Sequence, residues 1–269
     1  MIDEGNLLRK ASGFRDIRQI EKDYLLTMIP REISSVFTTE IIFKGGTCLK
    51  YFYNLNRFSE DLDFAVDPSR TGEMIGRVYD KINAVFDNLN EQYSVVEREH
   101  RGHREGDNVV GVNFEIRVRW PLNARTGQLQ NIKIDLSTGN DLVLEPDTKF
   151  LLPQYEDITV FSILVMKVDE IVSEKVAAIL EKSRMRDIYD LYFLLHVRGA
   201  KFNEELVISK MEKRNESFDR NNLIRKISEA NNKKRWKSEL SYLVDPLPEI
   251  SEVTDLLNKI IEEDFFHLV

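Results

Sequence analysis

The sequence predicts an α+β fold, in which a mixed β-sheet flanked by helices is followed by a C-terminal helical part. Short apolar runs that alternate with period 2 lie between residues 40 and 138. From about residue 168 onward the pattern is helical, with breaks near 183–186, 198–203 and 245–249. We therefore expect a core domain over residues 1–160 and a helical domain over residues 161–269 that contributes to the functional site.

Local patterns justify each element of the first half. A helix is predicted over residues 14–40, because Ile20, Tyr24 and Met28 share one face, and Pro30 should interrupt or restart it. The segments that follow are predicted to be a strand at 40–43, a turn at 44–47, a short helix at 48–54, a strand at 61–66 and a helix at 72–92. Strands at 109–120 and 131–138 should form an antiparallel hairpin.

A further strand is expected to start at residues 93–98, and the polar, glycine-containing segment 99–108 should be an exposed loop. His100 and His103 in this loop have HxxH spacing. No third ligand accompanies them, so the pair does not predict a zinc site.

Composition and charge restrict the possible classes of protein. The chain of 269 residues has a single cysteine, Cys48, so it can form no internal disulfide. The first residues lack a signal-peptide pattern and no apolar run is long enough to span a bilayer, so we expect a cytoplasmic protein without a membrane partner. The net charge of −8 argues against non-specific nucleic-acid binding by the whole surface.

The charge is unevenly distributed along the helical half. Residues 175–237 contain sixteen Lys or Arg against nine Asp or Glu, whereas residues 238–269 contain one against eight. Either an acidic partner binds the first segment, or both segments are solvated helix faces. The run "KKRWK" at 233–237 offers cations for phosphate contacts and one aromatic ring for stacking.

Three carboxylates are the candidate centre of the site. In the strand "DLDFAV", Asp61 and Asp63 point to one face and their Cα atoms lie roughly 6–7 Å apart. In "NIKIDLS", Asp135 shares a face with Lys133, and it would join the first two carboxylates if the two strands were neighbours. Like charges that gather in this way imply a bound cation such as Mg²⁺. Taken singly, each Asp could equally be an exposed strand residue.

Two further segments carry candidate residues. The glycine pair Gly45–Gly46 stands between a strand and a helix, where backbone N–H groups can approach a phosphate, and Thr47 could cap the helix. In "SEKVAAILEKSRMRDIYDLYFLL", Lys175 and the pair Asp187 and Asp190 lie among apolar residues. An unbroken helix would hold Lys175 and Asp187 roughly 18 Å apart, so a shared role requires a helix break at "KSRMR". Alternatively, Lys175 extends along the helix to solvent.

The order of these motifs resembles the DNA polymerase β-type nucleotidyltransferase superfamily. "KGGTCLKYF", "RFSEDLDF" and "EKVAAILEKSRMRDIYDLYFLL" more narrowly resemble the AbiEii/AbiGii toxin family, over roughly residues 43–195. The spacer between the glycines and Asp61 is longer than is usual in that family.

The resemblance implies transfer of a nucleotide from an NTP to an acceptor, with Mg²⁺ or Mn²⁺ as cofactor. It implies catalytic roles for Asp61, Asp63, Asp135, Lys175, Asp187 and Asp190, with the first three as metal ligands. It implies nucleotide-binding roles for Lys44, Gly45, Gly46, Thr47, Arg57 and Ser59. It also implies the toxin of a type IV-like toxin–antitoxin or phage-defence system, with a cognate antitoxin.

Three interpretations of the acceptor and activity remain open at this level. The basic segment 175–237 favours an RNA acceptor, such as a tRNA 3′ end. The first alternative is nucleotide transfer to a small molecule of the antibiotic type. The second is a non-catalytic nucleotide-binding module, against which the retention of three desolvated acids argues.

Overall fold

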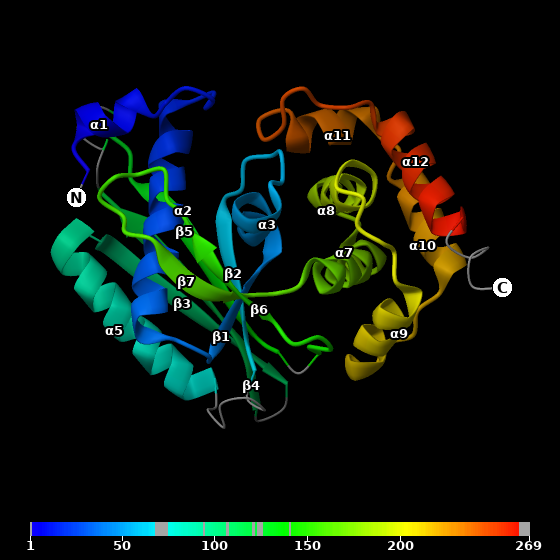
Figure 1. The fold of residues 1–269 in the computed structure, drawn as a ribbon, viewed down its shortest axis with the longest axis horizontal. Coiled ribbons are helices and arrows are strands. Elements are labelled where there is room, and N and C mark those ends of the chain that lie inside the picture. The colour runs from blue at the N-terminus through cyan, green and yellow to red at the C-terminus, as the bar shows by residue number, and fades with distance from the viewer. Residues whose placement is uncertain are drawn as a thin grey trace. The chain divides into compact units, whose positions relative to one another are not determined.

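The computed structural model describes residues 2–67, 75–93, 95–105, 108–119, 122, 126–139 and 141–263. The chain divides into two compact units (Figure 1). The sheet unit comprises Met1–Phe52, Ser59–Asn140 and Pro146–Val165. The helical unit comprises Tyr53–Phe58, Asp141–Glu145 and Met166–Val269.

The sheet unit is built on a mixed sheet with the strand order β3-β4-β5-β2-β1-β7-β6 among the described residues. The strands are β1 (Ile41–Lys44), β2 (Asp61–Val66), β3 (Val95–Glu105), β4 (Asn108–Val118), β5 (Gln130–Thr138), β6 (Asp147–Leu151) and β7 (Phe161–Val165). The pairs β2–β5 and β1–β7 are parallel and the other pairs are antiparallel. The predicted mixed sheet and the β4–β5 hairpin are confirmed. Strands β6 and β7 were not predicted, because most of β6 is exposed and most of β7 is buried, so neither strand alternates with period 2.

Helices cover the apolar face of the sheet. The helices of this unit are α1 (Glu4–Arg9), α2 (Ile17–Val36), α3 (Gly45–Tyr53) and α5 (Ile75–Tyr93). Helix α2 packs on β5 and β7, α5 packs on β3 and β4, and the two helices contact each other (Figure 1). Phe114 of β4 meets the rings of Tyr79 and Phe86 from α5. Because side chains alternate along β2, β4 and β5, the polar residues of these strands lie on the other face of the sheet.

Two local expectations for this unit were wrong. Helix α2 runs through Pro30 without a break, because Pro30 and most of its neighbours are buried and tertiary packing outweighs the roughly 3 kcal/mol that an internal proline costs. Strand β3 continues through the segment expected to be a loop, as far as Glu105. Its residues are polar, but pairing with β4 satisfies the backbone hydrogen bonds without requiring an apolar pattern.

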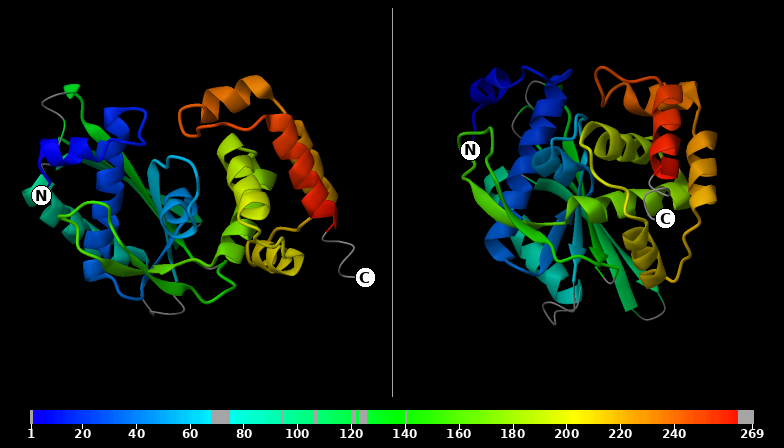
Figure 2. Two further views of the ribbon diagram at one scale, coloured as in Figure 1. Left: turned by 45° about the horizontal axis from the view of Figure 1, so that its top comes forward. Right: turned by 45° about the vertical axis from the view of Figure 1, so that its right-hand side comes forward.

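The helical unit contains α7 (Val168–Lys182), α8 (Met185–Tyr192), the π-helix η1 (Phe193–Val197), α9 (Glu204–Lys213), α10 (Arg220–Glu229), α11 (Lys233–Leu240) and α12 (Ile250–Glu263). The three predicted breaks are confirmed. Helices α10 and α12 lie side by side (Figures 1 and 2). In the described part of the chain, no helix is both long and apolar enough to cross a bilayer.

Candidate active site

The sheet brings the three predicted carboxylates onto one face. Strands β2 and β5 are parallel neighbours, and Asp63 is the register partner of Asp135. Asp61 lies two residues earlier on the same face, opposite Lys133. Neighbouring strands are about 4.8 Å apart, so all three carboxylates belong to one small patch. The condition set by the sequence, that these two strands be neighbours, is confirmed.

Asp135 is half-buried in this patch. Burial raises the pKa of its carboxyl group above the usual value, and the nearby Asp61 carboxylate acts in the same direction. Lys44, His103 and a hydrogen bond from the Asn113 side chain oppose that rise in pKa. Lys44 is the register partner of Asp63 on β1, so the predicted lysine also lies on this face. A cation bound here would favour the ionised form of Asp135.

Gly45 lies directly against this patch. It has a φ of +74°, and a Cβ at this position would come within 2.7 Å of Asp63 Cγ. Only glycine therefore lets the backbone lie this close to the carboxylate. The glycine pair begins α3 instead of forming a turn before it, so Thr47 lies inside the first turn and the expected capping role is wrong.

Gly45→Ala should destabilise the protein by more than the conformational strain alone. Gly127 is the matched control, because it has a similar φ of +66°, and a Cβ added there would meet no atom within 4 Å. We expect Gly127→Ala to cost about 1–2 kcal/mol, the usual strain of a left-handed residue. Gly45→Ala must also displace the Asp63 carboxylate, so it should lose more stability and most nucleotide transfer. Urea unfolding measures the loss of stability, and a transfer assay measures the loss of activity. Equal losses of stability in the two variants would contradict close packing of Gly45 against Asp63.

Thr47 and Ser59 hold the segment before β2 in place. The Thr47 side chain is fully buried, and its Oγ1 donates to the carbonyl oxygen of Asp61 at 2.5 Å. It also lies 2.8 Å from Ser59 Oγ, which is buried as well. These hydroxyl groups therefore fix the start of the strand that carries the carboxylates.

The helical unit assembles the second set of predicted residues. Helix α7 ends at Ser183, which has a φ of 45°, and α8 starts two residues later. The break allows Lys175 Nζ to lie 2.8 Å from Asp187 Oδ1 and 2.7 Å from Asp190 Oδ2. The predicted break at "KSRMR" is confirmed. Because the Lys175 side chain is only 12% exposed, it does not extend to solvent as the alternative required.

Asp190 connects two cations in this cluster. Its fully buried carboxylate accepts from Arg57 Nε at 2.6 Å and from Arg57 Nη2 at 2.8 Å, a bidentate pair. Burial alone would raise the pKa of Asp190, but Arg57 and Lys175 lower it to about 2. Burial lowers the pKa of Lys175, but Asp190 and Asp187 outweigh this and raise it above the usual value. The cluster therefore holds one fixed, charged lysine.

The donor chemistry of the sheet patch fits a hard divalent cation, since carboxylate oxygens are the ligands that Mg²⁺ and Mn²⁺ prefer. As the side chains lie, however, no group of three or more His, Cys, Asp or Glu residues in the described ranges is arranged to hold a metal ion. The backbone register brings the three carboxylates together, and their side chains would have to converge for a metal ion to bind.

The basic run in α11 does not provide the expected stacking surface. Trp236 is buried, and its Nε1 donates to the carbonyl oxygen of Pro248 at 2.8 Å. Lys233 pairs with Glu249 at 2.8 Å. Arg235 pairs with Glu239 at 2.6 Å. The expectation was wrong because Trp236 occupies the apolar face of a short amphipathic helix and packs near Tyr189.

Several polar residues on the sheet face that carries Asp135 were not predicted from the sequence. Asn113 is the register partner of Asp135, and Arg101 of β3 is in turn the partner of Asn113. The alternation of β5 already placed Lys133 on the face of Asp135. Arg101 gave no such signal, because β3 is polar on both faces and has no period to detect.

This mixed sheet, with a glycine pair opening a helix beside carboxylates on adjacent strands, defines a nucleotidyltransferase. A family model described as "Nucleotidyl transferase AbiEii toxin, Type IV TA system" matches residues 32–261. The chain belongs to this family of nucleotidyltransferase toxins. None of the curated proteins compared with the chain matches it.

Solved structures share the fold. JHP933 from Helicobacter pylori is 19% identical, with a TM-score of 0.51 over 93% of this chain and 96% of that one. A putative nucleotidyltransferase from H. pylori is 18% identical, with a TM-score of 0.55 over 93% and 97%. MenT4, a nucleotidyltransferase toxin from Mycobacterium tuberculosis, is 18% identical, with a TM-score of 0.57 over 97% and 89%. At these identities the similarity supports the α+β nucleotidyltransferase fold.

Proposed function

We propose that this toxin transfers a nucleotide from an NTP to an RNA acceptor, such as a tRNA 3′ end, in a reaction that depends on Mg²⁺ or Mn²⁺. The observation that carries the proposal is the register of β2 and β5, which aligns Asp63 with Asp135 and places Asp61 on the same face. Phosphoryl transfer depends mainly on charge neutralisation and positioning. The carboxylates of this patch would hold the metal ion that neutralises phosphate charge, and the fixed backbone would provide the positioning.

The residues of the sheet unit divide into two groups by role. Asp61, Asp63 and Asp135 would hold the metal, which when bound would neutralise phosphate charge and make the acceptor hydroxyl group more acidic. Gly45 and Gly46 would let the N-terminus of α3 approach the triphosphate. In the reaction, the acceptor oxygen bonds to the α-phosphorus, the bond to the bridging oxygen breaks, and pyrophosphate leaves. The released proton passes to solvent.

The residues of the helical unit would supply a fixed cation. We propose that Lys175 neutralises phosphate charge, held in its charged form by Asp187 and Asp190. Asp190 is fully buried and already bonded to Arg57, so its role is to orient Arg57 and Lys175, not to accept a proton. Arg57, which is bonded to the Asp190 carboxylate, would also be a positioning residue, because it holds that carboxylate in place.

The experiment that tests the function uses the four NTPs, each labelled on the α-phosphate. The protein is incubated with Mg²⁺ and one NTP, and with total RNA, total protein or a small-molecule extract from cells. We expect label in RNA, and digestion of the labelled RNA to 5′-mononucleotides should release the label in the added 3′-terminal nucleotide. Label in the small-molecule fraction alone would show that the acceptor is a small molecule and not RNA. No label in any fraction, with all four NTPs intact, would contradict nucleotide transfer.

The family's description as a toxin of a type IV toxin–antitoxin system supports a toxin role, for which we propose phage defence as one setting. We propose that a cognate antitoxin counteracts the activity in the cell. Expression of the toxin alone should therefore arrest growth, and a variant without transfer activity should not.

A further inference from the structure

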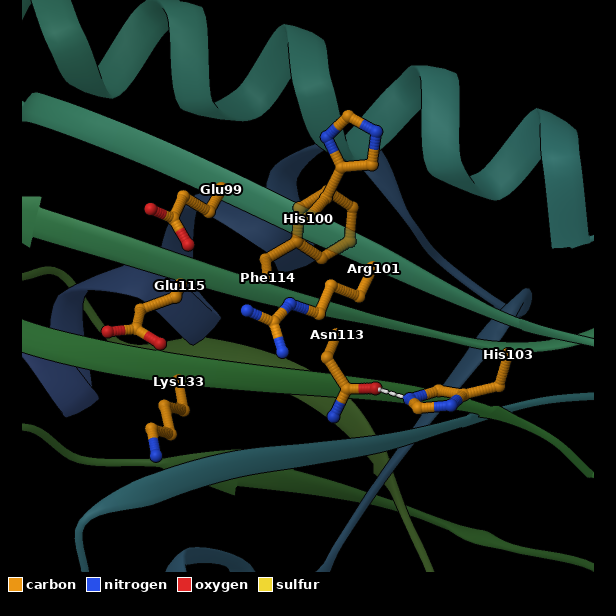
Figure 3. A pocket seen from close by; sticks show the side chains of 8 residues that line it. All are labelled: Glu99, His100, Arg101, His103, Asn113, Phe114, Glu115 and Lys133. Atoms are coloured by element: carbon orange, nitrogen blue, oxygen red, sulfur yellow. Dashed lines mark hydrogen bonds between the residues drawn. The ribbon is translucent and has the colours of Figure 1, made fainter.

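The sheet unit contains a pocket of about 290 Å³ that neither the sequence motifs nor the proposed metal site uses. Its polar walls come from three adjacent strands, with Glu99, Arg101 and His103 from β3, Asn113 and Glu115 from β4, and Lys133 from β5 (Figure 3). Register pairs place these side chains on the face that carries Asp61, Asp63 and Asp135, because Glu99 pairs with Glu115 and Arg101 pairs with Asn113, and these partners in turn pair with Lys133 and Asp135.

The pocket adjoins the carboxylates through direct register pairs. Asn113 is the partner of Asp135, and Lys133 is the partner of Asp61. A hydrogen-bonded chain makes the same connection, because His103 Nε2 donates to Asn113 Oδ1 and the Asn113 side chain is hydrogen-bonded to Asp135 (Figure 3). The glycine pair lies beyond β2, at the start of the helix that follows β1. The carboxylates therefore separate the pocket from the glycine pair.

Two cations of the pocket are available for a ligand. Neither the Arg101 nor the Lys133 side chain forms an ion pair or a hydrogen bond with any residue that the structure describes, and both are exposed. This differs from α11, where Lys233 and Arg235 are paired with glutamates. An exposed, unpaired Arg and Lys on one face are suited to contact phosphate oxygens.

The two glutamates of the pocket also point to a ligand. Glu99 and Glu115 are register partners on antiparallel strands, an arrangement in which like charges destabilise the sheet. Asn131 donates to Glu115 at 2.7 Å, and Arg117 pairs with Glu115 at 3.7 Å, whereas Glu99 has no partner among the described residues. A ligand that donates hydrogen bonds, as ribose hydroxyl and base amino groups do, would relieve this repulsion.

From this combination we propose that the pocket on β3, β4 and β5 binds the terminal nucleotide of a polynucleotide acceptor. Arg101 and Lys133 contact its phosphates, and Glu99 and Glu115 accept hydrogen bonds from its ribose or base. The volume is at the lower end of the range for small-ligand sites and suits one nucleotide unit. The proposal rests on the proposed function, and it places the acceptor on one side of the carboxylates and the NTP on the other.

The test measures binding of a fluorescein-labelled, single-stranded RNA of mixed sequence at several salt concentrations. The variant is Arg101→Met with Lys133→Met, and the matched control is Arg77→Met with Lys259→Met, which removes the same two charges from exposed positions of α5 and α12 outside the basic segment. Two lost phosphate contacts should flatten the log–log salt slope by roughly 1.4 and weaken binding about tenfold or more at low salt. The control should change neither quantity, and the affinity for NTP should be unchanged in both. Thermal melting verifies that both variants fold.

Two results would overturn the proposal. Equal RNA affinity and salt slope for the wild type and the pocket variant would show that the acceptor does not bind here. A loss of NTP affinity in the pocket variant would show that the pocket holds the NTP instead. The proposed function is tested separately. If the wild-type protein labels no acceptor fraction, nucleotide transfer is wrong whatever the RNA affinity. If the wild-type protein labels RNA but the pocket variant binds RNA normally, only the pocket assignment is wrong.

Discussion

Asp63→Asn should reduce nucleotide transfer by roughly a thousandfold, because a metal-bound phosphoryl group gains several kcal/mol of charge stabilisation and each 1.36 kcal/mol is worth a factor of ten in rate. Asn keeps the shape of the side chain and removes its charge. Asp63 stands at the centre of the patch, as the register partner of both Lys44 and Asp135. The loss should appear as a fall in the labelling of RNA at saturating Mg²⁺, and as weaker Mn²⁺ binding measured by electron paramagnetic resonance.

Asp80→Asn is the matched control for this experiment. Asp80 is an exposed residue of α5, the helix that covers the opposite face of the sheet. The Asp80→Asn variant loses the same charge, but at a site away from the patch. Its transfer rate and Mn²⁺ affinity should therefore equal those of the wild type. Labelling by Asp63→Asn at near wild-type rates would show that the patch does not hold the catalytic metal.

Asp190→Asn should lower the free energy of unfolding by about 3–5 kcal/mol, the usual effect of removing one partner from a buried ion pair. The variant removes the carboxylate that Arg57 and Lys175 share, while both cations remain buried. Urea unfolding at neutral pH measures the loss. Asp187→Asn is the control, because within the described part of the chain Asp187 pairs with Lys175 alone and keeps 13% of its side chain exposed, so it should lose clearly less.

The pH dependence of the Asp190 effect follows from its pKa. The folded-state pKa of about 2 lies below the usual 3.8, so the ionised carboxylate stabilises the folded state above roughly pH 4, and this contribution is lost as the pH falls toward 2. The difference in unfolding free energy between the wild type and Asp190→Asn should therefore be constant from pH 5 to 7 and should narrow below pH 4. A difference that does not change with pH down to 2.5 would contradict a depressed pKa.

The sequence by itself determined the features that depend on local pattern. The alternation of "DLDFAV" placed Asp61 and Asp63 on one face, and the rise of a helix required a break between Lys175 and Asp187, which the structure confirms at Ser183. The order of the glycine pair and the acids led to the family that the family model matches. Such inferences succeed because periodicity and helix geometry are properties of a few consecutive residues.

Only the tertiary structure decided which distant segments meet. No local pattern shows that β2 and β5 are neighbours, so the partnership of Asp63 with Asp135 was conditional until the strand order was known. Strand β3 is polar on both faces and forms only because β4 supplies its hydrogen bonds. The pocket around Arg101 therefore also depends on this pairing. Trp236 looked like part of a nucleic-acid surface, but packing of the helices buries it. In each case the outcome depends on contacts between residues far apart in the chain, and the free energy of those contacts outweighs local preference.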